Sequence, residues 1–200
     1  MWITNVAYAK ATGKLKKLYD RIKGPDNVVD QIMMAHSLRP HTMEGHMALY
    51  KYVLHHSANT VPKWFLETLG VHVSLLNNCS YCVDHHFAGL RRLLGDDGKA
   101  SDIRAILEGG GREDILSPAQ QAALDYATQL TLEPQAPDEE LVIRMRDAGY
   151  DDGEILEINQ VVAYFNYANR TVLGLGVTTE GDILGLSPNE SDDPDNWSHT

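Results

Sequence analysis

The chain is short of cysteine, of long apolar runs and of positive charge. It has only two cysteines in 200 residues, too few for a disulfide scaffold. No apolar run approaches the roughly 18 residues needed to cross a bilayer, so we expect no membrane span. Lys and Arg total 17 against 28 Asp and Glu, a formal net charge of −11. Without a basic stripe, nucleic acid is not expected as a partner.

The first residues, "MWITNVAYAKATGKLKK", lack the apolar core of a secretory signal. We therefore expect a cytoplasmic protein. In a reducing cytosol, two neighbouring cysteines are more often catalytic or metal-binding than structural.

The apolar residues repeat with a helical period through most of the chain, and the few β-branched runs are too short to build a sheet. We therefore predict an all-α fold. One helical domain is expected over residues 1–186, followed by an acidic, mobile tail over residues 187–200. Start and stop signals place helices at residues 12–23, 28–37, 40–56, 60–76, about 79–94, 101–107, 119–132, 137–148 and 152–175.

The stretch "NNCSYCVDHH", residues 77–86, holds both cysteines. On a helix, Cys79 and Cys82 share one face, and His86 lies one turn beyond Cys82. If Asn78 caps this helix, both thiols lie near its first turn, where the helix dipole favours a thiolate. The stretch thus offers an attacking thiol, a resolving thiol and a histidine that transfers protons.

Two other interpretations of the cysteines stay open. Both could be inert core residues. Alternatively, Cys79 and Cys82 could bind zinc with a histidine that folds back, such as His72, His55 or His56. No fourth ligand stands at a familiar spacing, and we therefore favour redox use without a metal or cofactor.

Glu67 lies 12 residues before Cys79, on the helix that ends at residues 77–78. A turn there lets the two helices pack together and brings Glu67 back toward the thiols. A carboxylate beside an imidazole sets its tautomer and raises its basicity. On its own, Glu67 would be interpreted as a solvated surface acid.

The spacing Glu67-x11-Cys79-x2-Cys82-x3-His86 resembles the alkyl hydroperoxidase D family, within the carboxymuconolactone decarboxylase superfamily. The segments "LRPHTMEGHMALYKYVLH", "AALDYATQLTLEP" and "MRDAGYDDGEILEINQVVAYFNYANR" look like those of its peroxidase-related subgroup. The similarity covers roughly residues 3–180.

This resemblance implies an all-α protein that assembles as a homo-oligomer, a trimer or a hexamer. It also implies a thiol peroxidase that acts on a small hydroperoxide. Cys82 would attack the peroxide, Cys79 would close a disulfide, and His86 with Glu67 would relay protons. An external dithiol must then reduce the pair, and in the best-known relatives a lipoyl-bearing protein does so.

The chain departs from the family pattern at Tyr81, where alkyl hydroperoxidase D has a second relay histidine. His85 is a poorly aimed substitute for it. The helix dipole favours Cys79 as the more acidic thiol, whereas the histidine at i+4 favours Cys82; we follow the histidine and the family. A lyase acting on a lactone and a non-enzymatic redox sensor remain alternatives.

Overall fold

The computed structural model describes residues 1–110, 113–136, 139–189, 193 and 196–199. These residues are largely helical, and their only β-type pairing is an isolated bridge between Pro188 and His199. The α-helices are α1 (Gly13–Ile22), α2 (Gln31–Ala35), α3 (Pro40–Tyr50), α4 (Lys63–Leu76), α5 (Ser80–Leu94), α6 (Asp97–Leu107), α7 (Pro118–Leu132), α8 (Glu139–Asp147) and α9 (Asp152–Leu175). Short 3₁₀ turns are η1 (Tyr8–Lys10), η2 (Pro25–Asn27) and η4 (Glu113–Ile115), and η3 (Lys51–His55) is a π-helical turn. The predicted all-α fold is confirmed.

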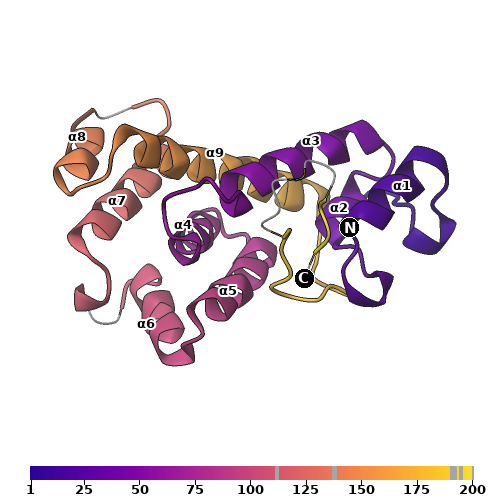
Figure 1. The fold of residues 1–200 in the computed structure, drawn as a ribbon, viewed down its shortest axis with the longest axis horizontal. Helices are drawn as coiled ribbons and strands as arrows, with labels where there is room; N and C mark the ends of the chain where they lie inside the picture. The colour runs from indigo at the N-terminus through magenta and orange to yellow at the C-terminus, as the bar shows by residue number, and fades with distance from the viewer. Residues whose placement is uncertain (111–112, 137–138, 190–192, 194–195, 200) are drawn as a thin grey trace.

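Helix α4 is the centre of the molecule. It packs against α5, α7 and α9, and α9 runs along the length of the fold (Figure 1). Most of the middle of α4 is buried, as expected for a helix that is apolar on nearly every side. Gly70 allows the close approach of α9, because a Cβ there would lie 2.2 Å from the Phe165 ring. This packing holds α4 firmly beside α5, the helix that carries the cysteines.

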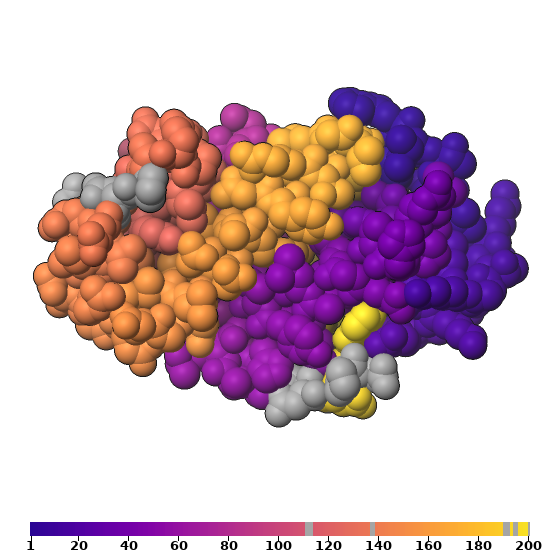
Figure 2. Space-filling view, turned by 90° about the horizontal axis from the view of Figure 1, so that it is seen from above, coloured from indigo at the N-terminus to yellow at the C-terminus, as the bar shows by residue number. Residues whose placement is uncertain are grey.

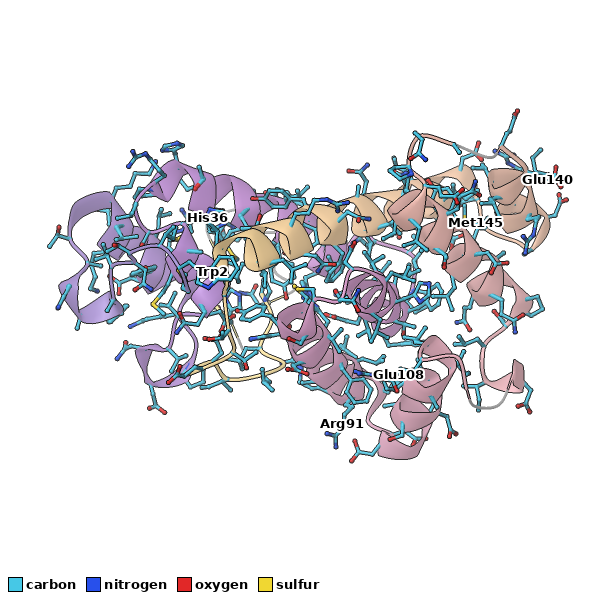
Figure 3. The ribbon with its side chains drawn as sticks, turned by 180° about the vertical axis from the view of Figure 1, so that it is seen from behind. Trp2, His36, Arg91, Glu108, Glu140 and Met145 are labelled. Carbon is cyan, nitrogen blue, oxygen red and sulfur yellow. The ribbon has the colours of Figure 1, made fainter. Side chains whose placement is uncertain are left out.

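The two ends of α9 meet different parts of the chain. At its C-terminal end, the backbone N–H of Trp2 donates to the Leu175 carbonyl at 2.8 Å, and Trp2 lies beside that end (Figure 3). Glu140 and Met145 mark α8 at the opposite end of the molecule (Figure 3). Seen from above, α9 lies alongside α3 (Figure 2), where His46 contacts the rings of Tyr164 and Tyr167.

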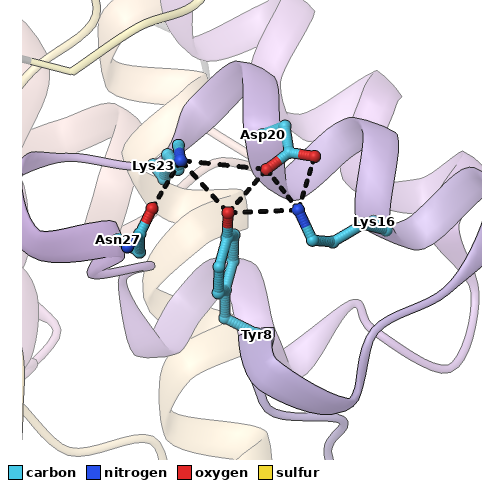
Figure 4. Close-up of polar contacts among 5 residues, drawn as sticks. All are labelled: Tyr8, Lys16, Asp20, Lys23 and Asn27. Atoms are coloured by element: carbon cyan, nitrogen blue, oxygen red, sulfur yellow. Dashed lines mark hydrogen bonds and ion pairs between the residues drawn. The ribbon is translucent and has the colours of Figure 1, made fainter.

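Residues 14–23 are the most basic stretch of the sequence, and two of its lysines, Lys16 and Lys23, have polar partners nearby (Figure 4). Lys16 lies 2.6 Å from the carboxylate of Asp20, and the Tyr8 hydroxyl donates to the same carboxylate at 2.6 Å. Lys23 donates to the Tyr8 oxygen at 3.1 Å and also bonds Asn27. Two lysines of this stretch are therefore engaged locally, rather than forming an open cationic surface.

Several helix boundaries match the sequence signals. Thr12 is the N-cap residue of α1, and Gly95 ends α5 in the left-handed conformation at φ 61°. Ser117 and Gln120 form a capping box at the start of α7. The helix expected over 137–148 is seen as α8, but residues 137 and 138 lie outside the described residues.

The helix predicted over residues 28–37 is wrong in its extent. Only α2, five residues long, is helical there. Asp26 and Asn27 have positive φ, at 56° and 59°, and Val28 is extended. The helix begins at Gln31 because its backbone N–H donates to both carboxylate oxygens of Asp182, at 3.0 and 3.1 Å. Asp182 is distant in sequence, so no local signal reveals this start.

The described residues of the expected tail pack against the body. Trp197 is buried, and the guanidinium of Arg21 lies 3.9 Å from its ring centre. The buried ammonium of Lys51 donates to the Asn196 carbonyl at 2.6 Å. Packing therefore continues beyond residue 186, where the sequence suggested that the domain ends.

None of the helices in the described residues combines the length and the apolar character that crossing a bilayer requires.

Candidate functional site

The two cysteines lie at the start of α5, directly after the turn that joins it to α4. Asn78 makes this turn with φ 56°, and the Cys79 N–H then donates to the Ser74 carbonyl at 2.8 Å. Cys79 itself is the N-cap residue of α5, so the prediction that Asn78 caps the helix is wrong by one residue. Cys82 stands one turn later, and both thiols are buried and unoxidised.

The paired thiols have opposite tendencies to ionise. The Cys82 thiol stabilises a thiolate on Cys79 and lowers the Cys79 pKa, although burial opposes this shift. The same contact, together with burial, raises the pKa of Cys82 well above its ordinary value. The Asn169 amide counteracts part of this rise. In the dithiol state Cys79 therefore holds the negative charge more readily, as the dipole argument suggested.

Glu67 and His86 form a close acid–base pair. Oε2 of Glu67 lies 2.6 Å from Nδ1 of His86, and Glu67 is only 2% exposed. The pairing of α4 with α5 brings them together, so the solvated surface acid that the sequence position alone suggested for Glu67 is wrong. A neutral His86 that donates from Nδ1 to the carboxylate leaves Nε2 free to accept a proton.

Glu67, Cys82 and His86 line one small cavity of about 30 Å³. Such a volume holds roughly one or two water molecules. The chain closes one side of the cavity at residues 185–187. There Gly185, with φ 81°, allows close approach, because a Cβ would lie 3.0 Å from Ala88. The cavity thus has room for a very small polar reactant beside Cys82.

Cys79 faces a different space. It lines a groove of about 270 Å³ together with Asn78, Ser80 and Asp84. Cys82 therefore borders the inner cavity, and Cys79, one helical turn away, borders the outer groove.

His55 is a residue of the site that sequence reasoning missed. Its Nε2 lies 3.8 Å from Oε1 of Glu67, and burial lowers its pKa well below the ordinary value. His55 belongs to the π-helical turn η3, a kind of distortion that often occurs at functional sites. The sequence suggested His55 only as a possible zinc ligand, and no spacing in the sequence links it to Glu67.

A second polar network borders the same cavity. The Tyr81 hydroxyl donates to Oδ2 of Asp182 at 2.7 Å, and Nε2 of His85 lies 3.1 Å from the same oxygen. Tyr81 and His85 therefore pair with Asp182 and not with Glu67, although they line the same cavity. His85 does not take the place of a second relay histidine on Glu67.

The histidines considered as zinc ligands lie elsewhere. Nε2 of His72 is 2.7 Å from the Thr128 hydroxyl, His55 faces Glu67, and the His56 ring packs on Tyr52. Within the described parts of the chain, no group of three or more His, Cys, Asp or Glu side chains is arranged to hold a metal ion.

Comparison with known proteins identifies the fold. No protein-family model matches the chain. The uncharacterised protein YdfG of Bacillus subtilis (strain 168) is 27% identical over 150 residues, which cover 74% of this chain and 96% of YdfG.

Two solved structures extend the comparison. An alkylhydroperoxidase AhpD core from Ralstonia eutropha JMP134, an uncharacterised peroxidase-related protein, superposes with a TM-score of 0.77 at 20% identity, covering 92% of this chain and 95% of that one. The apo debrominase Bmp8 superposes with a TM-score of 0.71 at 17% identity, covering 88% of this chain and 90% of that one. The alkyl hydroperoxidase D-like fold expected from the resemblance is confirmed.

Proposed function

We propose that this protein is a thiol-dependent, peroxidase-like oxidoreductase that reduces a small hydroperoxide through Cys82 and Cys79. The observation that carries the proposal is the shared cavity: the Cys82 side chain and the paired Glu67 and His86 line the same small space. A thiol there has a base at hand and is shielded from bulk solvent.

The raised pKa of Cys82 explains why a base is needed. His86 would take the thiol proton at Nε2 as the sulfur attacks, and Glu67 would stabilise the resulting imidazolium. The sulfur forms a bond to one peroxide oxygen, and the O–O bond breaks. Cys82 becomes a sulfenic acid, and the other oxygen leaves as an alkoxide or hydroxide that takes up a proton.

Cys79 suits the second step. It stands one helical turn from Cys82 at the start of α5, where the helix N-terminus favours a thiolate. That thiolate would attack the Cys82 sulfenic sulfur, form the disulfide and release hydroxide, which is protonated to water. An external dithiol would then reduce the disulfide. The groove beside Cys79 offers such a reductant, for example a lipoyl-bearing protein, a route of approach.

A second candidate function is a reductive debromination, which uses the same two-electron oxidation of the Cys79 and Cys82 thiols to a disulfide. Because the debrominase Bmp8 shares this fold, the dithiol could cleave a carbon–bromine bond. Bromide would leave, the carbon would gain a proton, and Cys79 and Cys82 would form a disulfide. The small volume beside Cys82 favours a hydroperoxide over a brominated ring.

The test is peroxide consumption in the presence of dithiothreitol. The wild type is expected to turn over continuously, Cys82→Ser to be inactive, and Cys79→Ser to lose the disulfide step. Ser101→Ala, an exposed change on α6 that borders neither the cavity nor the groove, is the matched control. A single oxidation without turnover would instead identify a redox sensor. Bromide release from 2,3,4-tribromopyrrole, with no peroxide consumption, would favour the second candidate.

Assembly and location remain predictions. We expect a cytoplasmic homo-oligomer, a trimer or a hexamer. Leu49, Tyr52 and Tyr167 are exposed, on elements that border one another at α3, η3 and α9. This surface is a reasonable place for contact between copies of the chain.

A further inference from the structure

Asp30 is an acid at the Cys82 cavity to which the sequence gave no role. It precedes α2 and lines the cavity together with Cys82, Glu67 and His86. Within the described residues, no hydrogen bond or ion pair engages its carboxyl group. Its neighbour Asp182 differs, because Tyr81 and the backbone of α2 donate to it.

The surroundings of Asp30 favour its protonated form. Burial raises the pKa of Asp30 to about 7; His85 opposes this rise, and the carboxylate of Asp182 adds to it. Every packed element contributes polar or titratable groups to the same cavity. They are His46 and Tyr50 from α3, Glu67 from α4, Tyr81, Cys82, His85 and His86 from α5, Tyr164 from α9, and Ser187 from the segment after α9. Asp182, from the same segment, contacts Tyr81 and His85 beside the cavity.

We propose that Asp30 is the general acid that protonates the leaving oxygen when Cys82 attacks a hydroperoxide. This role rests on the proposed peroxidase function. The Cys82 proton passes to His86, the sulfur–oxygen bond forms, and the O–O bond breaks. Asp30 gives its proton to the departing oxygen, which leaves as water or an alcohol. After the step His86 is protonated and Asp30 is deprotonated. Transfer of a proton from His86 back to Asp30 restores the starting state of both groups.

The other groups at the cavity are less suited to this task. Burial raises the pKa of both Tyr50 and Tyr164 well above the ordinary phenol value, which makes them weak acids. The Tyr81 hydroxyl is already donated to Asp182. His86 is engaged by Glu67 and serves as the base, so a separate acid allows both proton transfers to occur in one step.

The role predicts a dependence on the leaving group. Hydrogen peroxide expels hydroxide, a strong base that must be protonated as it leaves. Peracetic acid expels acetate, a weak base that needs no acid catalyst. Loss of Asp30 should therefore slow oxidation by hydrogen peroxide much more than oxidation by peracetic acid.

The experiment measures the rate of Cys82 oxidation by both oxidants from pH 5 to 9. Asp30→Asn should react with hydrogen peroxide ~10²-fold more slowly, with little change for peracetic acid. In the wild type, deprotonation of Asp30 should lower the rate with hydrogen peroxide above about pH 7. Asp30→Asn should not show this decrease. Asp30→Glu should restore much of the rate, and Asp26→Asn, an exposed change nearby, should match the wild type.

Two results would overturn the role of Asp30. One is an Asp30→Asn rate equal to that of the wild type with hydrogen peroxide, and the other is an equal loss with both oxidants in a folded variant. Either leaves the peroxidase itself in place. A wild type that neither oxidant converts to the disulfide would remove the peroxidase function, and the role of Asp30 with it.

Discussion

Oε2 of Glu67 lies 2.6 Å from Nδ1 of His86, although 19 residues separate the two along the chain. The contact joins the middle of α4 to the second turn of α5, and both side chains border the cavity beside Cys82. The carboxylate of Glu67 favours the proton on Nδ1 of the His86 imidazole, which leaves Nε2 as the nitrogen that can accept a proton.

Glu67→Gln should slow Cys82 oxidation by ~10–100-fold with the fold intact, because an amide cannot stabilise the His86 imidazolium. Stopped-flow oxidation by hydrogen peroxide measures this loss. Glu44→Gln is the matched control, since Glu44 pairs with Lys14 on the surface, away from the cavity. Equal rates for all three proteins would reduce Glu67 to a structural residue.

Asn169 should influence the Cys82 thiol directly. Its amide lowers the Cys82 pKa and also donates to the Ser74 hydroxyl at 3.0 Å. Asn169→Leu should raise the Cys82 pKa further and slow its alkylation, while destabilising the fold by about 1–3 kcal/mol through lost hydrogen bonds. The pH dependence of iodoacetamide alkylation, with Cys79→Ser as the background, reports the shift.

Asn166→Leu provides the comparison. Asn166 lies on the same helix and shares Asn77 as a hydrogen-bond partner, but it does not affect the pKa of either cysteine. It should lose stability without any shift in thiol pKa. A matching pKa shift in both variants would show that loosened packing, rather than the Asn169 amide, controls the thiol.

Stability should fall as the solution is acidified. Burial lowers the pKa of His46 to about 3, that of His199 to about 4, and that of His55 well below its ordinary value. Below about pH 6.5 these histidines therefore bind protons in the unfolded chain but stay neutral in the folded chain. Each such histidine should cost about 2 kcal/mol between pH 6.5 and pH 5.

Asp30 acts with the opposite sign, because its raised pKa favours the folded state more as the pH falls from about 7. The three histidines outweigh it, so urea unfolding should show a net loss of stability at pH 5 relative to pH 8. Asp30→Asn should therefore steepen the rise in stability from pH 5 to pH 8, whereas His46→Gln should flatten it. Constant stability across this range would mean that the histidines are not held neutral.

The sequence predicted the part of the site that depends on local geometry. Helical spacing places Cys79, Cys82 and His86 together, and one turn between two helices returns Glu67 to them. The boundary of α5 was missed by one residue because the positive φ of Asn78 depends on the turn itself, not on a capping side chain.

The remaining site residues depend on long-range packing. His55 is positioned by a π-helical turn, and Asp30 by its place directly before the short helix α2. Asp182 lies in a segment beyond the last helix. Each comes from a segment far from the cysteines in sequence, so the spacing of residues along one helix does not connect it to them. The inner cavity and the outer groove, which distinguish Cys82 from Cys79, likewise exist only in the packed structure.

The most direct test is to trap the sulfenic acid after a single equivalent of hydrogen peroxide and to locate it by mass spectrometry with a dione probe. In Cys79→Ser, the adduct should form on Cys82, at a rate that Glu67→Gln decreases. In Cys82→Ser, Cys79 should remain largely unlabelled. Labelling of Cys79 alone, or of neither residue while peroxide is still consumed, would contradict a reaction that begins at Cys82.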